Sequence, residues 1–118
     1  MQYLLLIYQN EAEMAKRTPA AAKVITEEYR ILIQSLVGSG HFKGADRLRG
    51  TSTASTVRVH NGKTVVSDGP FAETREQLGG YMMVEAKDLD EACAIAARIP
   101  GAKEGCVEVR PVWPQGEY

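Results

Sequence analysis

The sequence has few of the residues from which metal centres and disulfide frameworks are built. Its 118 residues include two cysteines, Cys93 and Cys106, and two histidines, His41 and His60. Two cysteines make no disulfide framework in a chain of this length, and no Cys-x-x-Cys pair is present to bind zinc. We therefore expect free, buried thiols and no metal. No cofactor is expected either.

Long apolar runs and a strong net charge are also missing. No stretch approaches the roughly 20 apolar residues that span a membrane, and the apolar residues 1–8 have no basic lead-in or cleavage site typical of a secretion signal. The net charge is −1, so general attraction to nucleic acid is not expected. The composition, 44% hydrophobic and 25% charged, indicates one globular domain over residues 1–118. We expect it in the cytoplasm.

The apolar spacing predicts two helices. The first begins after Thr18-Pro19, an N-cap followed by proline, and ends at Gly38. The second opens with an Asp-x-x-Glu capping pair at residues 88–91 and ends at Pro100. The apolar stripe of the first helix consists of Val24, Ile25, Tyr29, Leu32, Ile33 and Leu36. That of the second consists of Ala92, Ile95, Ala96 and Ile99.

Strands are expected around these helices, at residues 3–8, 45–49, 55–60, 63–67, 81–86 and 106–112. Asn61-Gly62 predicts a tight hairpin turn, because both residues tolerate positive φ. Residues 9–17 are expected to form a loop. Residues 70–78 are expected to form one or two helical turns, ended by Gly79-Gly80.

This order predicts an α+β fold of the ferredoxin-like kind, an antiparallel sheet with two helices on one face. The strand at residues 3–8 is apolar on both sides. The face without helices would expose a larger apolar patch than monomers usually carry. We therefore expect a homodimer in which two sheets pack face to face.

The stretch from Asp68 to Tyr81, DGPFAETREQLGGY, resembles the YCII-related proteins of the DGPF type, as do Leu89–Ala92, Ala97–Pro100 and Gly105–Val112. The resemblance runs from the first strand to about Val112. It implies a bacterial protein, a dimeric α+β barrel with a cleft in each protomer, and an association with extracytoplasmic-function sigma factors. Shorter YciI-type relatives have a proposed histidine–aspartate pair, but Tyr29 stands where that histidine is expected.

Asp68 is the candidate catalytic residue. A carboxylate at a strand end that opens into a cleft is able to act as a general base or to hold a cation or an amine. The alternative is a turn role, in which Asp68 accepts backbone N–H bonds. The candidate ligand-binding residues are Tyr29, His41, Arg49, Glu73, Thr74 and Tyr81.

The other candidates also have structural alternatives. Tyr29 fits a core tyrosine, His41 a residue beyond the first helix, and Arg49 an ion pair. Glu73 and Glu76 would share a helical face but would equally suit the start of a helix.

Three functions stay open at this point. The first is a small-molecule binding protein or cofactor-independent enzyme, with a cleft near Asp68, Tyr81, Tyr29 and Arg49. The second is a regulatory module that binds a sigma factor. In the third, the loop after Asp68 is purely architectural.

Overall fold

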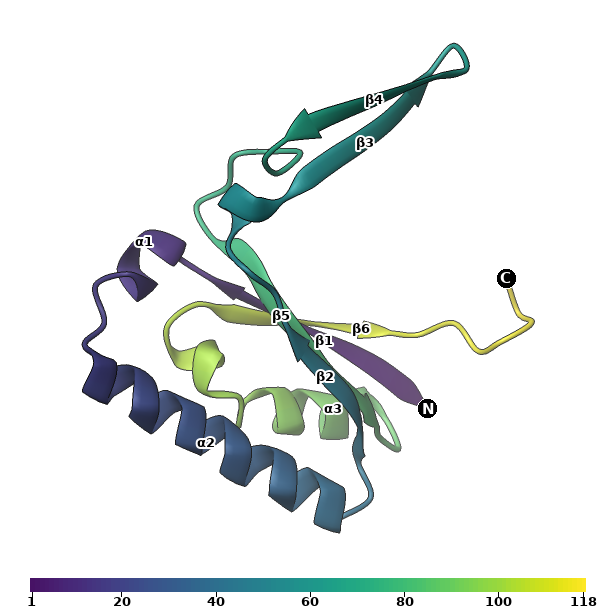
Figure 1. Cartoon of the computed structure of the whole chain (residues 1–118). Helices are drawn as coiled ribbons and strands as arrows, with labels where there is room; N and C mark the ends of the chain where they lie inside the picture. The colour runs from purple at the N-terminus through teal and green to yellow at the C-terminus, as the bar shows by residue number, and fades with distance from the viewer.

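Four antiparallel strands form the central sheet of the computed structural model, which describes residues 1–118 (Figure 1). Their order across the sheet is β2 (Phe42–Arg47), β5 (Gln77–Glu85), β1 (Gln2–Gln9) and β6 (Cys106–Pro111). The helices α2 (Pro19–Gly38) and α3 (Leu89–Ala96) lie on one face of this sheet. The fold is α+β and ferredoxin-like, as predicted.

Shorter elements connect these parts. The helix α1 (Glu11–Met14) precedes α2, and the 3₁₀ turns η1 (Thr51–Thr53) and η2 (Pro100–Lys103) follow β2 and α3. Between β2 and β5 the chain forms a separate hairpin of β3 (Ser55–His60) and β4 (Lys63–Asp68). None of the helices combines the length and apolar character that crossing a membrane requires.

Both main helices begin at the predicted caps. The hydroxyl of Thr18 accepts a hydrogen bond from the Ala21 N–H at 3.1 Å, and Pro19 occupies the first turn. The Asp88 carboxylate accepts from the Glu91 N–H at 2.9 Å. The caps satisfy N–H groups that have no partner within the helix, so local sequence defines where each helix starts.

The core lies between the sheet and the two helices. Tyr3, Leu5 and Ile7 of β1 face the helices and are buried, while Leu4, Leu6 and Tyr8 alternate with them and are half-buried on the open face. The thinnest dimension of the molecule is 19 Å, which fits one sheet and one helix layer. The buried apolar cluster consists of Tyr3, Leu5, Ile7, Leu32, Leu36, Met82, Val84, Ala86, Ala92, Ile95, Ala96 and Ile99.

The β3–β4 hairpin projects away from the sheet (Figure 1). Its turn is the predicted one, with Asn61 at φ 50° and Gly62 at φ 76°. Its strands pair only with each other. The hairpin therefore adds surface to the molecule without adding to the core.

Several expectations about secondary structure and two about burial need correction. Residues 11–14 are helical, β2 begins at Phe42 rather than at residue 45, and Val24 is exposed on α2. Both cysteines are free but exposed. The segment 70–76 contains no helix.

Side chains replace helical hydrogen bonding in that segment. The Thr74 hydroxyl donates to the Glu76 carbonyl at 2.7 Å, and the Gln77 amide donates to the Thr74 carbonyl at 2.6 Å. These side chain to main chain bonds compete with a helix and favour a turn. Glu73 and Glu76 consequently do not share a helical face.

The glycine pair was expected to precede a strand but lies inside β5. Opposite it, the register of β1 shifts between Ile7, which pairs with Gly80, and Tyr8, which pairs with Leu78. Gly79 is thus the extra residue of a β-bulge, a frequent position for glycine. A Cβ at Gly80 would lie 2.7 Å from the Asp46 carbonyl oxygen, so β2 approaches β5 too closely there for a side chain.

We predict that Gly80→Ala destabilises the protein by about 1–3 kcal/mol, because the added methyl group meets backbone that has to shift. The control is Gly44→Ala in the neighbouring strand β2, where an added Cβ would meet nothing within 4 Å. Urea unfolding of both variants measures the two free energies. Equal stability of Gly80→Ala and Gly44→Ala would contradict the close approach.

Candidate functional site

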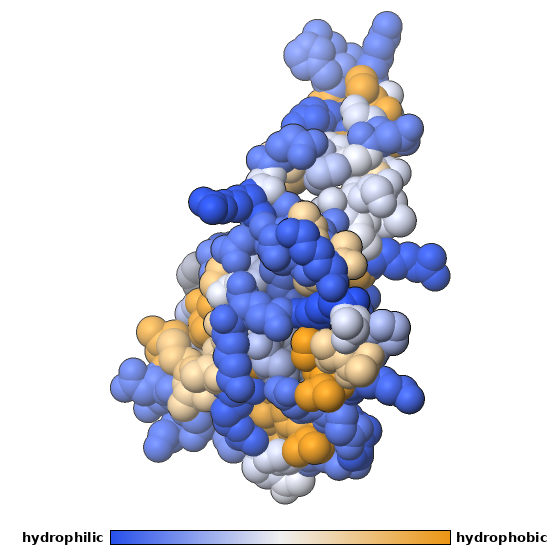
Figure 2. All heavy atoms as spheres, turned by 90° about the vertical axis from the view of Figure 1, so that its left-hand side faces the viewer, coloured by the Kyte–Doolittle hydropathy of each residue, from blue (hydrophilic) through white to orange (hydrophobic).

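A cavity of about 290 Å³ lies between α2 and the sheet. Its floor is formed by β1, β2 and β5, and α2 and the segment before it form its wall. Figure 2 shows the side of the molecule on which α1 and α2 lie. The apolar lining includes Ile7, Met14, Ala22, Ile25, Ile33, Ala45 and Met82, and the polar lining includes Gln9, Arg17, Thr26, Tyr29, Asp46, Arg47 and Tyr81.

Tyr29 is the polar residue at the centre of this arrangement. Its phenol oxygen accepts a hydrogen bond from the Gly101 N–H at 3.2 Å. No acceptor within the chain takes the phenol proton, so that proton is free for a ligand. Burial raises the pKa of Tyr29 above its usual value of about 10. The hydrogen bond from Gly101 and the charges of Arg17 and Arg47 lower the pKa, but by less. The phenol is therefore neutral near pH 7.

Gly101 allows this contact because it has no side chain. A Cβ there would lie 2.8 Å from the Gln9 amide nitrogen, 2.9 Å from the Ile7 side chain and 2.9 Å from the Tyr29 oxygen. Gln9 is the one buried polar residue of the chain, with 8% exposure. The turn η2 thus packs its backbone against the polar end of the cavity.

Two arginines bring positive charge to the cavity. Arg17 forms an ion pair with Glu104, which joins the segment before α2 to the end of η2. Arg47, at the end of β2, forms no ion pair. Both arginines line the same cavity as Tyr29 and favour the ionised form of its phenol electrostatically. The lining therefore combines apolar walls with a cationic, hydrogen-bonding end.

Asp46 and Tyr81 also border the cavity but bind each other. The Tyr81 O–H donates to the Asp46 carboxylate at 2.5 Å, and this bond raises the pKa of Tyr81. Side chains alternate along β5, and Met82 faces the helices with 1% exposure, so the Tyr81 ring lies on the open face. The Tyr81 phenol is therefore turned away from the helix-covered face of the sheet, on which the cavity lies.

The structure brings together only part of the predicted site. Tyr29 and Tyr81 border the cavity, whereas Asp68, Glu73 and Thr74 lie in the exposed stretch at the base of the hairpin. Arg49 lines a separate open hollow beside Arg47. Roles of these residues in binding or catalysis stay predictions.

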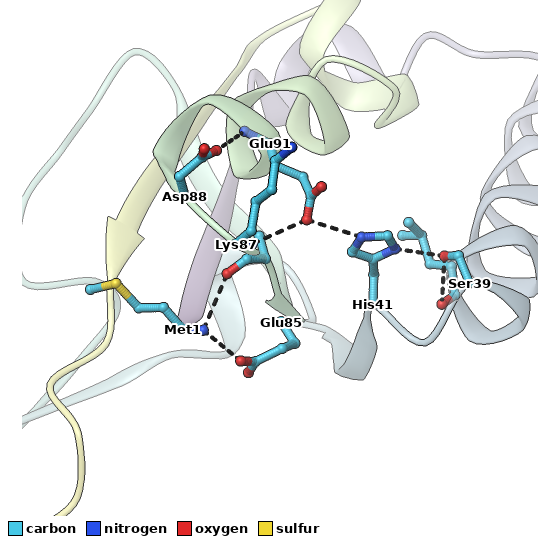
Figure 3. A network of polar contacts seen from close by, with 9 residues as sticks. Met1, Ser39, His41, Glu85, Lys87, Asp88 and Glu91 are labelled. Carbon is cyan, nitrogen blue, oxygen red and sulfur yellow. Dashed lines mark hydrogen bonds and ion pairs between the residues drawn. The ribbon is translucent and has the colours of Figure 1, made fainter.

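His41 lies at the opposite end of α2, in the network of Figure 3. Its Nδ1 is 2.7 Å from the Ser39 hydroxyl, and its Nε2 is 3.1 Å from the Glu91 carboxylate. Glu91 also accepts from the Lys87 N–H at 3.1 Å. That backbone bond, with a further contribution from His41, lowers the pKa of Glu91. The network connects the end of α2 to the start of α3.

Gln9, Arg17 and Arg47 were missed by the sequence reasoning. Gln9 ends a strand, Arg17 precedes a helix cap, and Arg47 lies in an edge strand. Their only shared signal is a polar residue at an element end, which is too common to select a site. No group of three His, Cys, Asp or Glu residues in the chain is placed to hold a metal ion.

Comparison with known proteins identifies the family and the fold. A family model of the YCII-related domain matches residues 1–115. An uncharacterised protein of Rhizobium meliloti is 33% identical over 114 residues, covering 95% of this chain and 92% of its own. The expected sigma-factor partner stays a prediction.

A solved structure is similar in fold. It is 5-chloro-2-hydroxyhydroquinone dehydrochlorinase from Burkholderia phenoliruptrix, in complex with 2,5-dihydroxybenzoquinone. The TM-score is 0.50 and the identity 16%, with 98% of this chain and 96% of that chain covered. At this identity the likeness shows the fold alone.

We predict that Glu91→Gln lowers the melting temperature more at pH 7 than at pH 3. The pKa of Glu91 is lowered in the folded state. The stabilising effect of the Glu91 carboxylate is therefore present at pH values above its pKa in the unfolded chain, which is about 4.3. It is lost as the pH falls through its lowered pKa in the folded chain. Thermal unfolding across this pH range measures the difference. The control, Glu28→Gln, removes a carboxylate from the exposed side of α2. A pH-independent effect of Glu91→Gln would refute the linkage.

Proposed function

We propose that this chain, which belongs to the YCII-related family, binds a small organic anion in the cavity between α2 and the sheet. The observation that carries the proposal is the juxtaposition of Arg17, Arg47 and the neutral Tyr29 phenol at one end of an apolar cavity. Concave, mostly apolar sites with a few converging polar groups are the usual form of small-molecule sites.

The lining suggests how such a ligand would lie. Its acidic group would face Arg17 and Arg47, and an oxygen acceptor would take the free proton of Tyr29. Its apolar body would contact Ile7 and Met82, among the apolar side chains of the floor. A volume of about 290 Å³ is at the lower limit for drug-sized ligands, so a compact, single-ring compound fits best.

The similar fold offers one compound of this class. The dehydrochlorinase was solved with 2,5-dihydroxybenzoquinone, a single ring with acidic hydroxyl groups. This supports aromatic or quinoid anions as the first probes. Activity on chlorinated rings does not transfer at 16% identity.

Binding is favoured over proton abstraction within a single chain. Tyr29 holds its proton near neutrality, and Asp46, the carboxylate in the lining, accepts a hydrogen bond from Tyr81. A general base needs a carboxylate or imidazole within hydrogen-bond reach of the substrate. Asp68 lies outside the lining and does not supply one here.

We also propose that a second copy covers the open face of the sheet. Leu4, Leu6 and Tyr8 of β1 lie beside Tyr81 and Met83 of β5 on this face. Charged side chains of β6 border the apolar centre. A sheet-to-sheet dimer would remove this surface from water, with two sheets about 10 Å apart.

We predict that Arg47→Gln weakens binding of 2,5-dihydroxybenzoquinone or benzoate at least about 10-fold, because a charge-assisted hydrogen bond is lost. The control is Arg58→Gln, which makes the same charge change on the hairpin. Isothermal titration calorimetry at low salt measures both affinities.

The neutral analogue benzyl alcohol should bind weakly to the wild type and to both variants. Equal losses of benzoate binding in Arg47→Gln and Arg58→Gln would indicate general charge attraction and would refute the proposed site. Failure of the wild type to bind any of the anions would refute the ligand class.

A further inference from the structure

We propose that the β3–β4 hairpin is a dimerisation arm, whose valine-bearing face packs against a second copy of this chain. This surface is separate from the cavity and does not depend on the ligand proposed for it. The argument rests on the register of the hairpin, its isolation from the core and the total accessible area of the chain.

The strand register divides the hairpin into two chemically different faces. Val57 lies opposite Val66, and Val59 lies opposite Thr64, so the three valines share one face. Residues directly opposite each other in an antiparallel pair point to the same side. Arg58 lies opposite Val65. The second face is therefore basic, since His60 and Lys63 also lie on it.

The valine face is exposed in the single chain. Val57 is 59% exposed, Val66 61% and Val59 70%. Figure 2 shows hydrophobic atoms at the surface of the projecting hairpin, away from the main body. Three valines aligned on one face are a contiguous apolar surface rather than scattered exposed residues.

The hairpin lacks the contacts that would stabilise it within its own chain. Two hydrogen bonds hold its base, from the Gly69 N–H to the Ala54 carbonyl at 2.7 Å and from the Thr56 hydroxyl to the Gly69 carbonyl at 2.9 Å. Beyond them its strands pair only with each other. An isolated two-stranded hairpin is marginally stable in water and needs a further strand or a packing surface.

The accessible area indicates how much surface a partner would cover. The chain exposes 8359 Å², whereas a compact monomer of 12.9 kDa exposes about 6,300 Å². The radius of gyration is 16.3 Å, against about 13.5 Å for a compact domain of this length. The excess of about 2,000 Å² per chain is in the range that obligate homodimers bury.

A second copy is the occupant that accounts for both uncovered surfaces. The valine face and the open face of the sheet belong to one chain, and a two-fold dimer presents each of them on both partners. Asp68 lies opposite Ser55 at the root of the valine face, and Phe71, with 78% exposure, follows it. The loop after Asp68 is then the base of an arm, positioned against the partner.

The test compares lysine substitutions of two adjacent valines. Val66→Lys charges the valine face, and Val65→Lys makes the same change on the basic face, where Val65 is 50% exposed. Sedimentation and light scattering between about 1 and 200 µM give the dimer dissociation constant. We expect a wild-type mass of twice 12.9 kDa. We expect Val66→Lys to raise the dissociation constant at least about 10-fold and Val65→Lys about two-fold or less.

Folding of the variants is checked by circular dichroism, and both should keep the wild-type spectrum because neither valine is part of the core cluster.

A third variant, Leu6→Lys, tests the open face of the sheet separately. Dissociation by Leu6→Lys without an effect of Val66→Lys would refute the arm and leave the sheet dimer standing. A monomeric wild type, or equal effects of Val65→Lys and Val66→Lys, would also overturn the arm. Calorimetry with benzoate tests the cavity independently of all these outcomes.

Discussion

The strand β1 has apolar side chains on both faces, and this property constrains the whole molecule. Leu5 and Ile7 face the helices, while Leu4 and Leu6 face away from them. Burial of apolar area is the main force that favours folding, and two helices are able to satisfy only one face of a sheet. The inner face becomes the core. The outer face stays available for a second sheet, and the thin, extended shape of the chain follows from this division.

The cavity results from close backbone approach at the end of the same strand. Gly80 lets β2 approach β5, and Gly101 lets η2 reach the Tyr29 phenol. The bulge opposite Ile7 and Tyr8 changes the direction of β5 where it forms the floor. Bulges are frequent beside binding sites because they redirect a strand locally. Residues that look like chain breakers in the sequence thus shape a concave surface in the fold.

Local signals in the sequence were sufficient for the main helices and the hairpin turn, and insufficient for the site. Thr18-Pro19, Asp88 and Asn61-Gly62 act on their immediate neighbours, so their helices and turn could be predicted. Gly79-Gly80 could not be interpreted correctly, because the reason for glycine is a carbonyl of Asp46 in another strand.

The site required contacts that no local pattern encodes. Arg17 and Arg47 come together only through the packing of α2 on the sheet. Asp68 was predicted to be a catalytic residue because polar loops often carry function. Its distance from the cavity depends on the direction in which the hairpin leaves the sheet, which no short motif specifies.

The chemistry of the cationic, hydrogen-bonding end of the cavity depends on the residue at one position, Tyr29. Resemblance to the YciI-type proteins would put a histidine where this chain has Tyr29. A histidine titrates near neutrality and takes up or releases a proton there. A buried phenol with a raised pKa donates a hydrogen bond and keeps its proton. Besides this phenol the cavity has arginines, which are always charged donors, and its one carboxylate, Asp46, already accepts a hydrogen bond from Tyr81. A ligand that complements this end of the cavity must bring the negative charge and the acceptor oxygens, which is why an organic anion suits this cavity better than a neutral or cationic compound.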